Sequence, residues 1–254
     1  MANLPLGDVG AARLLPYTGP GDAKATVVFL HDEESSVPEG LLAALQERGT
    51  VVAPVHPGFG DAPRPAWVKT VRDIADYELD VIDEAGPAPL VLVGSSFGGW
   101  VAAELALRLS QRVRGVLLLG PLGLHVQDEL IADHWFRTPQ QRARLLYEDP
   151  MKAPQVGIEE SVANDESMAR YGWNPRLVDP ALAPRLRRLS APVRILWGEA
   201  ERFVPASHAE AWLAALPDAS SARVPGSGHF LAYEARESVL AELDDLIGRT
   251  ATGA

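Results

Sequence analysis

The 254-residue sequence contains no cysteine. This absence excludes disulfide bonds, a thiolate nucleophile and a cysteine-ligated zinc site, and it fits the cytoplasm, where we expect the protein. Basic residues are also few, with 23 Lys and Arg against 34 Asp and Glu and a formal net charge of -11. Because no run of Lys or Arg forms a patch for phosphates or anionic lipid, we expect neither nucleic acid nor a membrane surface as a partner.

Long apolar runs are missing as well. No stretch reaches the roughly 18 apolar residues that predict a membrane-spanning helix, and the chain does not begin with a basic segment followed by an apolar one, as a secretory signal does. Apolar residues nevertheless make up 47% of the chain, which is ample for a large core. We expect a soluble globular protein, a monomer or a homodimer, whose partner is a small-molecule substrate.

Short β-branched runs alternate with segments of helical periodicity along most of the chain. We predict strands at 25–31, 49–60, 89–94, 113–120, 191–198 and 220–226. Helices are predicted between them at 41–49, 67–84, 100–109 and 208–216, with a closing helix whose apolar face holds Val239, Leu240, Leu243, Leu246 and Ile247. This alternation is typical of an α/β fold with a mostly parallel sheet covered by helices.

The alternation breaks between residues 122 and 186, where no convincing strand occurs. The pattern there indicates short helices separated by prolines, namely Pro139, Pro150, Pro154, Pro175 and Pro180. We therefore expect a helical insertion at 122–186 in a core made of residues 1–121 and 187–254.

Residues 91–100, VLVGSSFGGW, place two serines between an apolar run and a cluster of glycines. The pattern G-x-S-x-G selects Ser96, because Gly94 and Gly98 lie two residues to either side, whereas Ser95 lacks the first glycine. A strand before the turn and a helix after it are the setting of a nucleophile elbow. The other interpretation is a plain strand–turn–helix connection that needed small residues for packing.

A serine becomes a nucleophile when a base removes its proton and an acid orients that base. His229 is the candidate base, because it follows the last predicted strand and precedes the last helix. Four other histidines are interpreted as structural or solvated: His56, His125, His134 and His208. The segment WGEAERFVP, after the preceding strand, offers Glu199 and Glu201 as the acid.

These segments together resemble the α/β-hydrolase fold of esterases, lactonases and carbon–carbon bond hydrolases. The resemblance covers nearly the whole chain, through HDEESS, HPGFGDAPRP, GSSFGG, WGEAERFVP and GSGHFLAYEARESV in the family's order. It implies an α/β-hydrolase fold with a helical cap inserted after strand six. It also implies Ser96 as nucleophile, His229 as general base and Glu201 as orienting acid, with an oxyanion hole made by the backbone amides of Phe97 and Glu33.

The sequence departs from the family pattern at two places. Glu201 stands where the family usually has aspartate, so Glu199 or Asp128 stays open as a substitute. The family's His-Gly turn is His31-Asp32 here, followed by two glutamates.

Three carboxylates, those of Asp32, Glu33 and Glu34, thus crowd the place where an oxyanion should form. Two unit charges about 6 Å apart repel by roughly 3 kcal/mol at an effective dielectric near 20, which is comparable to what one oxyanion-hole donor supplies. We expect that at most Glu33 faces the pocket, either protonated as a hydrogen-bond donor or aimed at a cationic substrate group. The alternative is three solvated loop acids. A metal site made of His31, Asp32 and Glu33 is disfavoured by their adjacent spacing.

The predicted function is hydrolysis of a carboxylic ester or lactone through an acyl-enzyme, with no cofactor and no metal. His31 and several large side chains of the insertion are expected to contact a small apolar or aromatic substrate, although packing within the insertion is the other interpretation; these are Trp135, Phe136, Tyr147, Met151, Tyr171 and Trp173. Two alternatives stay open: a carbon–carbon bond hydrolase acting on a vinylogous diketone, and a catalytically weak ligand-binding protein on the same scaffold.

Overall fold

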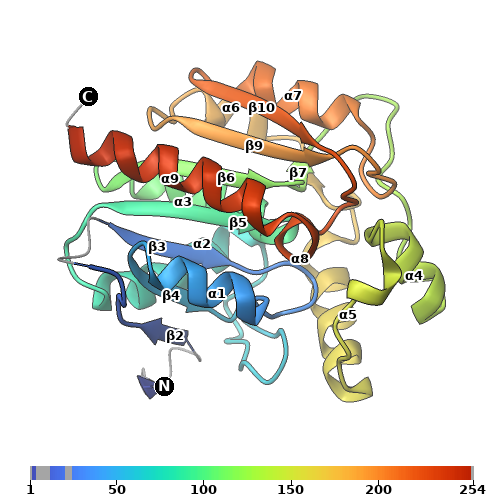
Figure 1. Cartoon of the computed structure of the whole chain (residues 1–254). Coiled ribbons are helices and arrows are strands. Elements are labelled where there is room, and N and C mark those ends of the chain that lie inside the picture. The colour runs from blue at the N-terminus through green and yellow to red at the C-terminus, as the bar shows by residue number, and fades with distance from the viewer. Residues whose placement is uncertain (1, 4–11, 21–24, 253–254) are drawn as a thin grey trace.

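A computed structural model describes residues 2–3, 12–20 and 25–252, and among these residues eight strands form one twisted sheet (Figure 1). In order across the sheet they are β1 (Ala2–Asn3), β2 (Ala12–Leu15), β4 (Thr50–Pro54), β3 (Thr26–Leu30), β5 (Leu90–Ser95), β6 (Val113–Leu119), β9 (Val193–Gly198) and β10 (Ala219–Val224). The six strands from β4 to β10 are parallel, whereas β1 and β2 run antiparallel at one edge.

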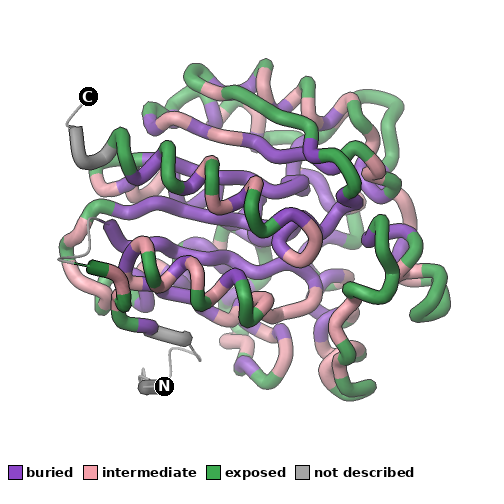
Figure 2. Tube along the Cα trace, viewed as in Figure 1, coloured by how far each residue is buried: buried purple, intermediate pink, exposed green. Residues whose placement is uncertain are grey.

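Helices cover both faces of this sheet. One face carries α1 (Glu39–Gln46), α8 (Leu231–Glu234) and α9 (Arg236–Thr252), and the other carries α2 (Val71–Glu84), α3 (Phe97–Arg108), α6 (Leu182–Leu186) and α7 (Ser207–Ala215). Strand β3 shows how both faces of the sheet are shielded from solvent, because its successive side chains point to opposite faces. Val27 and Phe29 join the core under α1 and α9, while Val28 and Leu30 join the core under α2 and α3. Figure 2 accordingly shows buried strands between helices whose outer sides are exposed.

The predicted strands and helices of the core are present, but several bounds differ, and the strand predicted at 49–60 ends at Pro54. The prediction missed β1 and β2, which are short, antiparallel edge strands. Helix α2 begins at Val71 rather than at residue 67, because Thr70 and Asp73 close a reciprocal capping box around its first turn. The last strand ends at Val224 instead of reaching residue 226.

The chain between β6 and β9 leaves the sheet at the carboxyl ends of the parallel strands. It forms β7 (Gly123–Leu124), α4 (Pro139–Leu146), a 3-10 turn η1 (Pro150–Lys152), α5 (Ile158–Gly172) and β8 (Val178–Asp179) before α6 returns to the sheet layer. Strands β7 and β8 pair with each other, which corrects the prediction of a segment without strands; at two residues each they are too short to produce an alternating pattern. The division at 122 and 186 stays a prediction, since α6 packs against α3 and α7.

Within the described residues, no helix combines the length and apolar character needed to cross a membrane.

Candidate active site

The turn between β5 and α3 holds Ser96 in a strained conformation. Its backbone has φ 49° and ψ -110°, a region that residues with a side chain rarely occupy. The neighbouring glycines are required by space: a Cβ on Gly94 would lie 2.4 Å from the carbonyl oxygen of Gly98, and one on Gly98 would lie 2.1 Å from that of Leu30. Packing thus explains the two glycines, as one of the two interpretations of the sequence proposed. It does not explain Ser96, which carries the backbone strain.

Three predicted residues meet at this turn. Nε2 of His229 lies 2.6 Å from Oγ of Ser96, and Nδ1 of the same ring lies 2.6 Å from Oε2 of Glu201. The other carboxylate oxygen of Glu201 accepts the backbone amides of Phe203 and Val204, at 2.7 and 3.2 Å. This carboxylate is thus fixed at both oxygens and can hold the imidazole in one orientation.

The two alternative acids lie elsewhere. Glu199 and Asp128 are exposed and neither contacts His229. The backbone amide of Glu201 donates to the carbonyl of Gly198 at 3.4 Å in the turn after β9.

The histidine loop after β10 is held from the insertion side. The carbonyl of Leu146, at the end of α4, accepts the backbone amides of His229 and Phe230 at 2.8 and 3.2 Å, and the ring of Phe203 stands edge-on to the imidazole. Burial alone would lower the pKa of His229, but the charge and the hydrogen bond of Glu201 outweigh it and raise the pKa above the ordinary value, and Glu33 adds to the rise only when it is ionised.

The acidic turn after β3 is folded inward. Asp32 is fully buried and accepts the Ser95 hydroxyl and the Glu34 amide, while Oε1 of Glu33, a residue 9% exposed, lies 2.7 Å from Oγ of Ser96. The interpretation of three solvated acids is therefore wrong for these two residues. Glu34 is half-buried and reaches the cavity described below.

Burial is the largest of the effects that raise the pKa of the carboxyls of Asp32, Glu33 and Glu34. It raises the pKa of Asp32 well above the usual range, with Glu33 and Glu34 adding to the effect. Burial and Glu33 together raise the pKa of Glu34 to about 7. Burial also raises the pKa of Glu33, although His229, the Ser96 hydroxyl and its own backbone amide act in the opposite direction.

A buried polar cluster behind this turn was missed by the sequence analysis. His31 accepts the backbone amide of His56 at Nε2 and donates from Nδ1 to the carbonyl of Asp32, so its ring is neutral and helps to fix the turn. His56 donates to the carbonyl of His31 and contacts the carboxyl of Glu78 through Nδ1. Burial lowers the pKa of His56 to about 3 and raises that of Glu78, and both shifts favour the neutral form of the group. The available signal was Glu78 itself, an acid within the apolar stripe of α2.

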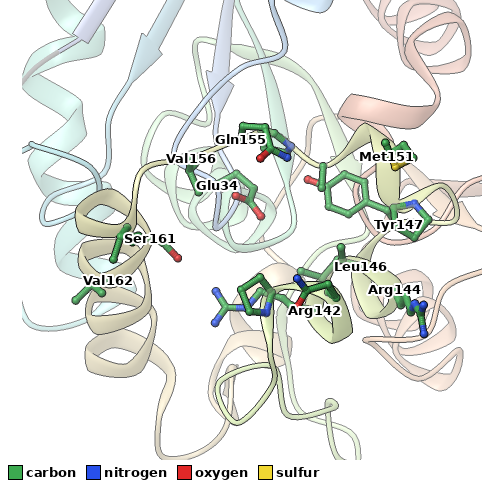
Figure 3. A pocket seen from close by; sticks show the side chains of 17 residues that line it. Glu34, Arg142, Arg144, Leu146, Tyr147, Met151, Gln155, Val156, Ser161 and Val162 are labelled. Atoms are coloured by element: carbon green, nitrogen blue, oxygen red, sulfur yellow. The ribbon is translucent and has the colours of Figure 1, made fainter.

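A cavity of about 600 Å³ opens beside the acidic turn, between α4, η1 and the first turns of α5. Figure 3 shows Glu34 within it, with Ser161 and Val162 on one side and Tyr147 on the other. The lining is mostly apolar, and its polar groups include Arg142, which is paired with Asp165 through two 2.8 Å bonds. Ser96 and His229 are buried and do not line this cavity.

Of the side chains predicted to contact substrate, the structure brings Tyr147 and Met151 to this cavity. Phe136 and Trp173 are exposed, and Trp135, half-buried, packs on Trp173. The others, His31 and Tyr171, are buried away from the cavity wall; Tyr171 donates to the carbonyl of Pro57. The hydroxyl of Tyr147 is buried and has no hydrogen-bond partner among the described residues.

No cluster of three or more metal-ligating side chains is found in the part of the chain that the structure describes. Phe97 is the first residue of α3 and directly follows Ser96, so its amide has no acceptor within the helix. The oxyanion role of this amide and of the Glu33 amide stays a prediction.

Comparison with known proteins agrees with this architecture. The chain is 28% identical over 239 residues to the dihydrolipoyllysine-residue acetyltransferase component of the acetoin cleaving system of Cupriavidus necator, matching 86% of this chain but only 62% of that protein. A meta-cleavage product hydrolase from Pseudomonas fluorescens superposes with a TM-score of 0.77 (18% identity, 94% of each chain). Naproxen esterase from Bacillus subtilis does so with a TM-score of 0.75 (20% identity, 93% of this chain and 86% of that one). Residues 27–243 match the sequence pattern of the alpha/beta hydrolase family, and the chain belongs to that family.

Proposed function

We propose that the protein is a serine hydrolase that cleaves a carboxylic ester or lactone of a small apolar or aromatic compound. The observation that carries this proposal is the continuous chain of short hydrogen bonds from Ser96 through His229 to Glu201. The mostly apolar cavity beside the acidic turn supports a substrate of this character.

The proposed reaction has two halves and uses no cofactor. His229, held by Glu201, takes the proton of Ser96 while Oγ attacks the substrate carbonyl. The amides of Phe97 and Glu33 receive the oxyanion, and His229 then returns the proton to the leaving oxygen. Water repeats the sequence on the acyl-enzyme and releases the acid.

A second candidate is cleavage of a carbon–carbon bond in a vinylogous diketone, which the likeness to the meta-cleavage product hydrolase favours. Glu34 weighs against it for a substrate that places a carboxylate in the cavity, since like charges would meet there once Glu34 is ionised. A third candidate is a ligand-binding protein with little turnover, favoured by the contact that ties the Ser96 hydroxyl to Glu33.

Treatment with a fluorophosphonate, followed by intact-mass measurement, tests whether the serine is activated. We expect one adduct on the wild-type protein and none on Ser96→Ala, because only a serine with a working base attacks phosphorus at a useful rate. A Ser95→Ala variant is the matched control and should still be labelled. A folded wild-type protein that gains no adduct would favour the ligand-binding candidate.

Glu201→Gln is expected to lower kcat on p-nitrophenyl butyrate by about 10⁴-fold, because an amide no longer stabilises the imidazolium that forms during attack. Glu199→Gln, which removes the exposed acid two residues earlier, should leave kcat within about threefold. Steady-state kinetics of the two variants decide the assignment, and an equal loss in both would contradict it.

A further inference from the structure

The hydroxyl of Ser96 has two partners, and the triad uses only one of them. Oγ lies 2.6 Å from Nε2 of His229 and 2.7 Å from Oε1 of Glu33. Ser96 and His229 are fully buried and Glu33 almost so, which keeps bulk water from competing for these contacts. The second carboxyl oxygen of Glu33 is buried, and no described residue forms a hydrogen bond with it.

Two hydrogen bonds on one hydroxyl oxygen require two protons, and the hydroxyl supplies one. The proton on Nδ1 of His229 points to Glu201, so it is not available. The second proton therefore sits either on Glu33 or on Nε2 of His229. In the first case Glu33 donates to Oγ and the hydroxyl donates to a neutral His229, which can act as base. In the second case His229 is already protonated and cannot act as the base.

The surroundings of Glu33 favour the first arrangement. Titratable groups face it from every element packed around it: Asp32 and Glu34 on its own turn, Glu201 and His229 in the loops after β9 and β10, Tyr147 after α4, and Tyr233 on α8. Among the described residues no Lys or Arg forms an ion pair with Asp32 or Glu33. An ionised Glu33 would leave a buried, unpaired carboxylate oxygen among other acids, whereas in a protonated Glu33 that oxygen is a neutral carbonyl, which costs less to bury.

We propose that Glu33 is a further catalytic residue, a protonated carboxyl that turns from Oγ of Ser96 to the substrate carbonyl oxygen and donates a hydrogen bond to the oxyanion. The proposal rests on the serine hydrolase function proposed above. A neutral acid at this place adds a donor to the oxyanion hole, whereas a carboxylate at the same place would repel the oxyanion.

The attack of Ser96 on the substrate carbonyl transfers one proton and leaves the Glu33 proton in place. The bond between Oγ and the carbonyl carbon forms, the π electron pair moves to the carbonyl oxygen, and the hydroxyl proton passes to Nε2 of His229. Glu33 shares its proton with the oxyanion but keeps it. When the intermediate collapses, the bond to the leaving oxygen breaks, that oxygen takes the electron pair and the proton from His229, and Glu33 returns to Oγ.

The pH dependence of acylation tests this proposal. The reactive form carries the Glu33 proton, so the second-order rate constant for p-nitrophenyl butyrate should fall about tenfold per pH unit above the pKa of that carboxyl. In an ordinary triad the rate rises as the histidine loses its proton and then stays level. We expect Glu33→Gln, a neutral donor of similar shape, to lose the alkaline fall, and Glu33→Ala to be about 10²-fold slower than Glu33→Gln at its optimum.

Glu34→Gln is the matched control, since it removes one charge from the same turn without touching Ser96; it should keep the alkaline fall. If the wild-type rate constant stayed level at alkaline pH, the proposal would be overturned. It would also be overturned if the fluorophosphonate labelled Glu33→Gln and Glu33→Ala faster than the wild type at every pH, because Glu33 would then only slow the reaction. Failure of the proposed function looks different: no variant would then form a Ser96 adduct at any pH.

Discussion

Ser96→Ala is expected to lower kcat on p-nitrophenyl butyrate by about 10⁶-fold, because the attacking oxygen is removed while the remaining groups stay in place. His229→Ala should cost about as much, since the hydroxyl that it leaves behind has lost its base. The two substitutions act on one step, so the double variant should be no slower than either single variant. Steady-state kinetics of the three proteins measure this directly.

Ser95→Ala provides the comparison on the same turn. Its hydroxyl donates to Asp32 rather than to a triad residue, so we expect a change in kcat of no more than about tenfold. Additive losses in the double variant would contradict the triad, because they would mean that Ser96 and His229 serve separate steps.

Gly98→Ala is expected to lower the free energy of unfolding by about 3 kcal/mol or more. The added methyl would lie 2.1 Å from the carbonyl oxygen of Leu30 and 2.4 Å from that of His31, and both are backbone atoms that cannot rotate away. Strand β3 and the elbow would have to move apart, which breaks packing on both sides. Urea unfolding followed by circular dichroism gives the value.

Gly248→Ala is the matched control for this substitution. Gly248 is exposed near the end of α9, and a Cβ there meets nothing within 4 Å. Alanine in a helix interior should therefore raise the free energy of unfolding by about 0.5–1 kcal/mol. If Gly98→Ala cost less than 1 kcal/mol, the turn would be able to relax, and the close approach would not explain the glycine.

The core of the fold was predictable because each parallel strand is buried on both faces and so appears as a short apolar run. Strand β6, with Val116, Leu117 and Leu118 in succession, is an example. Strands β1 and β2 have no such run, because a short strand at the edge of a sheet needs fewer apolar residues than a central strand. The start of α2 was missed because the apolar period extends back to Val68, while the helix begins only after the Thr70 cap.

The catalytic candidates were predictable for a topological reason. Ser96, Glu201 and His229 each follow a parallel strand, and the carboxyl ends of such strands meet at one edge of the sheet. The lining of the cavity does not follow from any comparable rule, since it depends on how the insertion packs. Tyr147 is therefore at the cavity and Phe136 is not, although both are aromatic residues of the same segment.

The spread of the triad along the chain also has a consequence for the order of folding. Ser96 follows β5, whereas Glu201 and His229 follow β9 and β10, which join the sheet only when β9 pairs with β6 across the whole insertion. Pairings that close such long loops form slowly compared with helices and local turns. Refolding molecules can thus regain most of their helical signal while the serine is still inert, and the return of serine reactivity marks the moment at which the two ends of the sheet are joined.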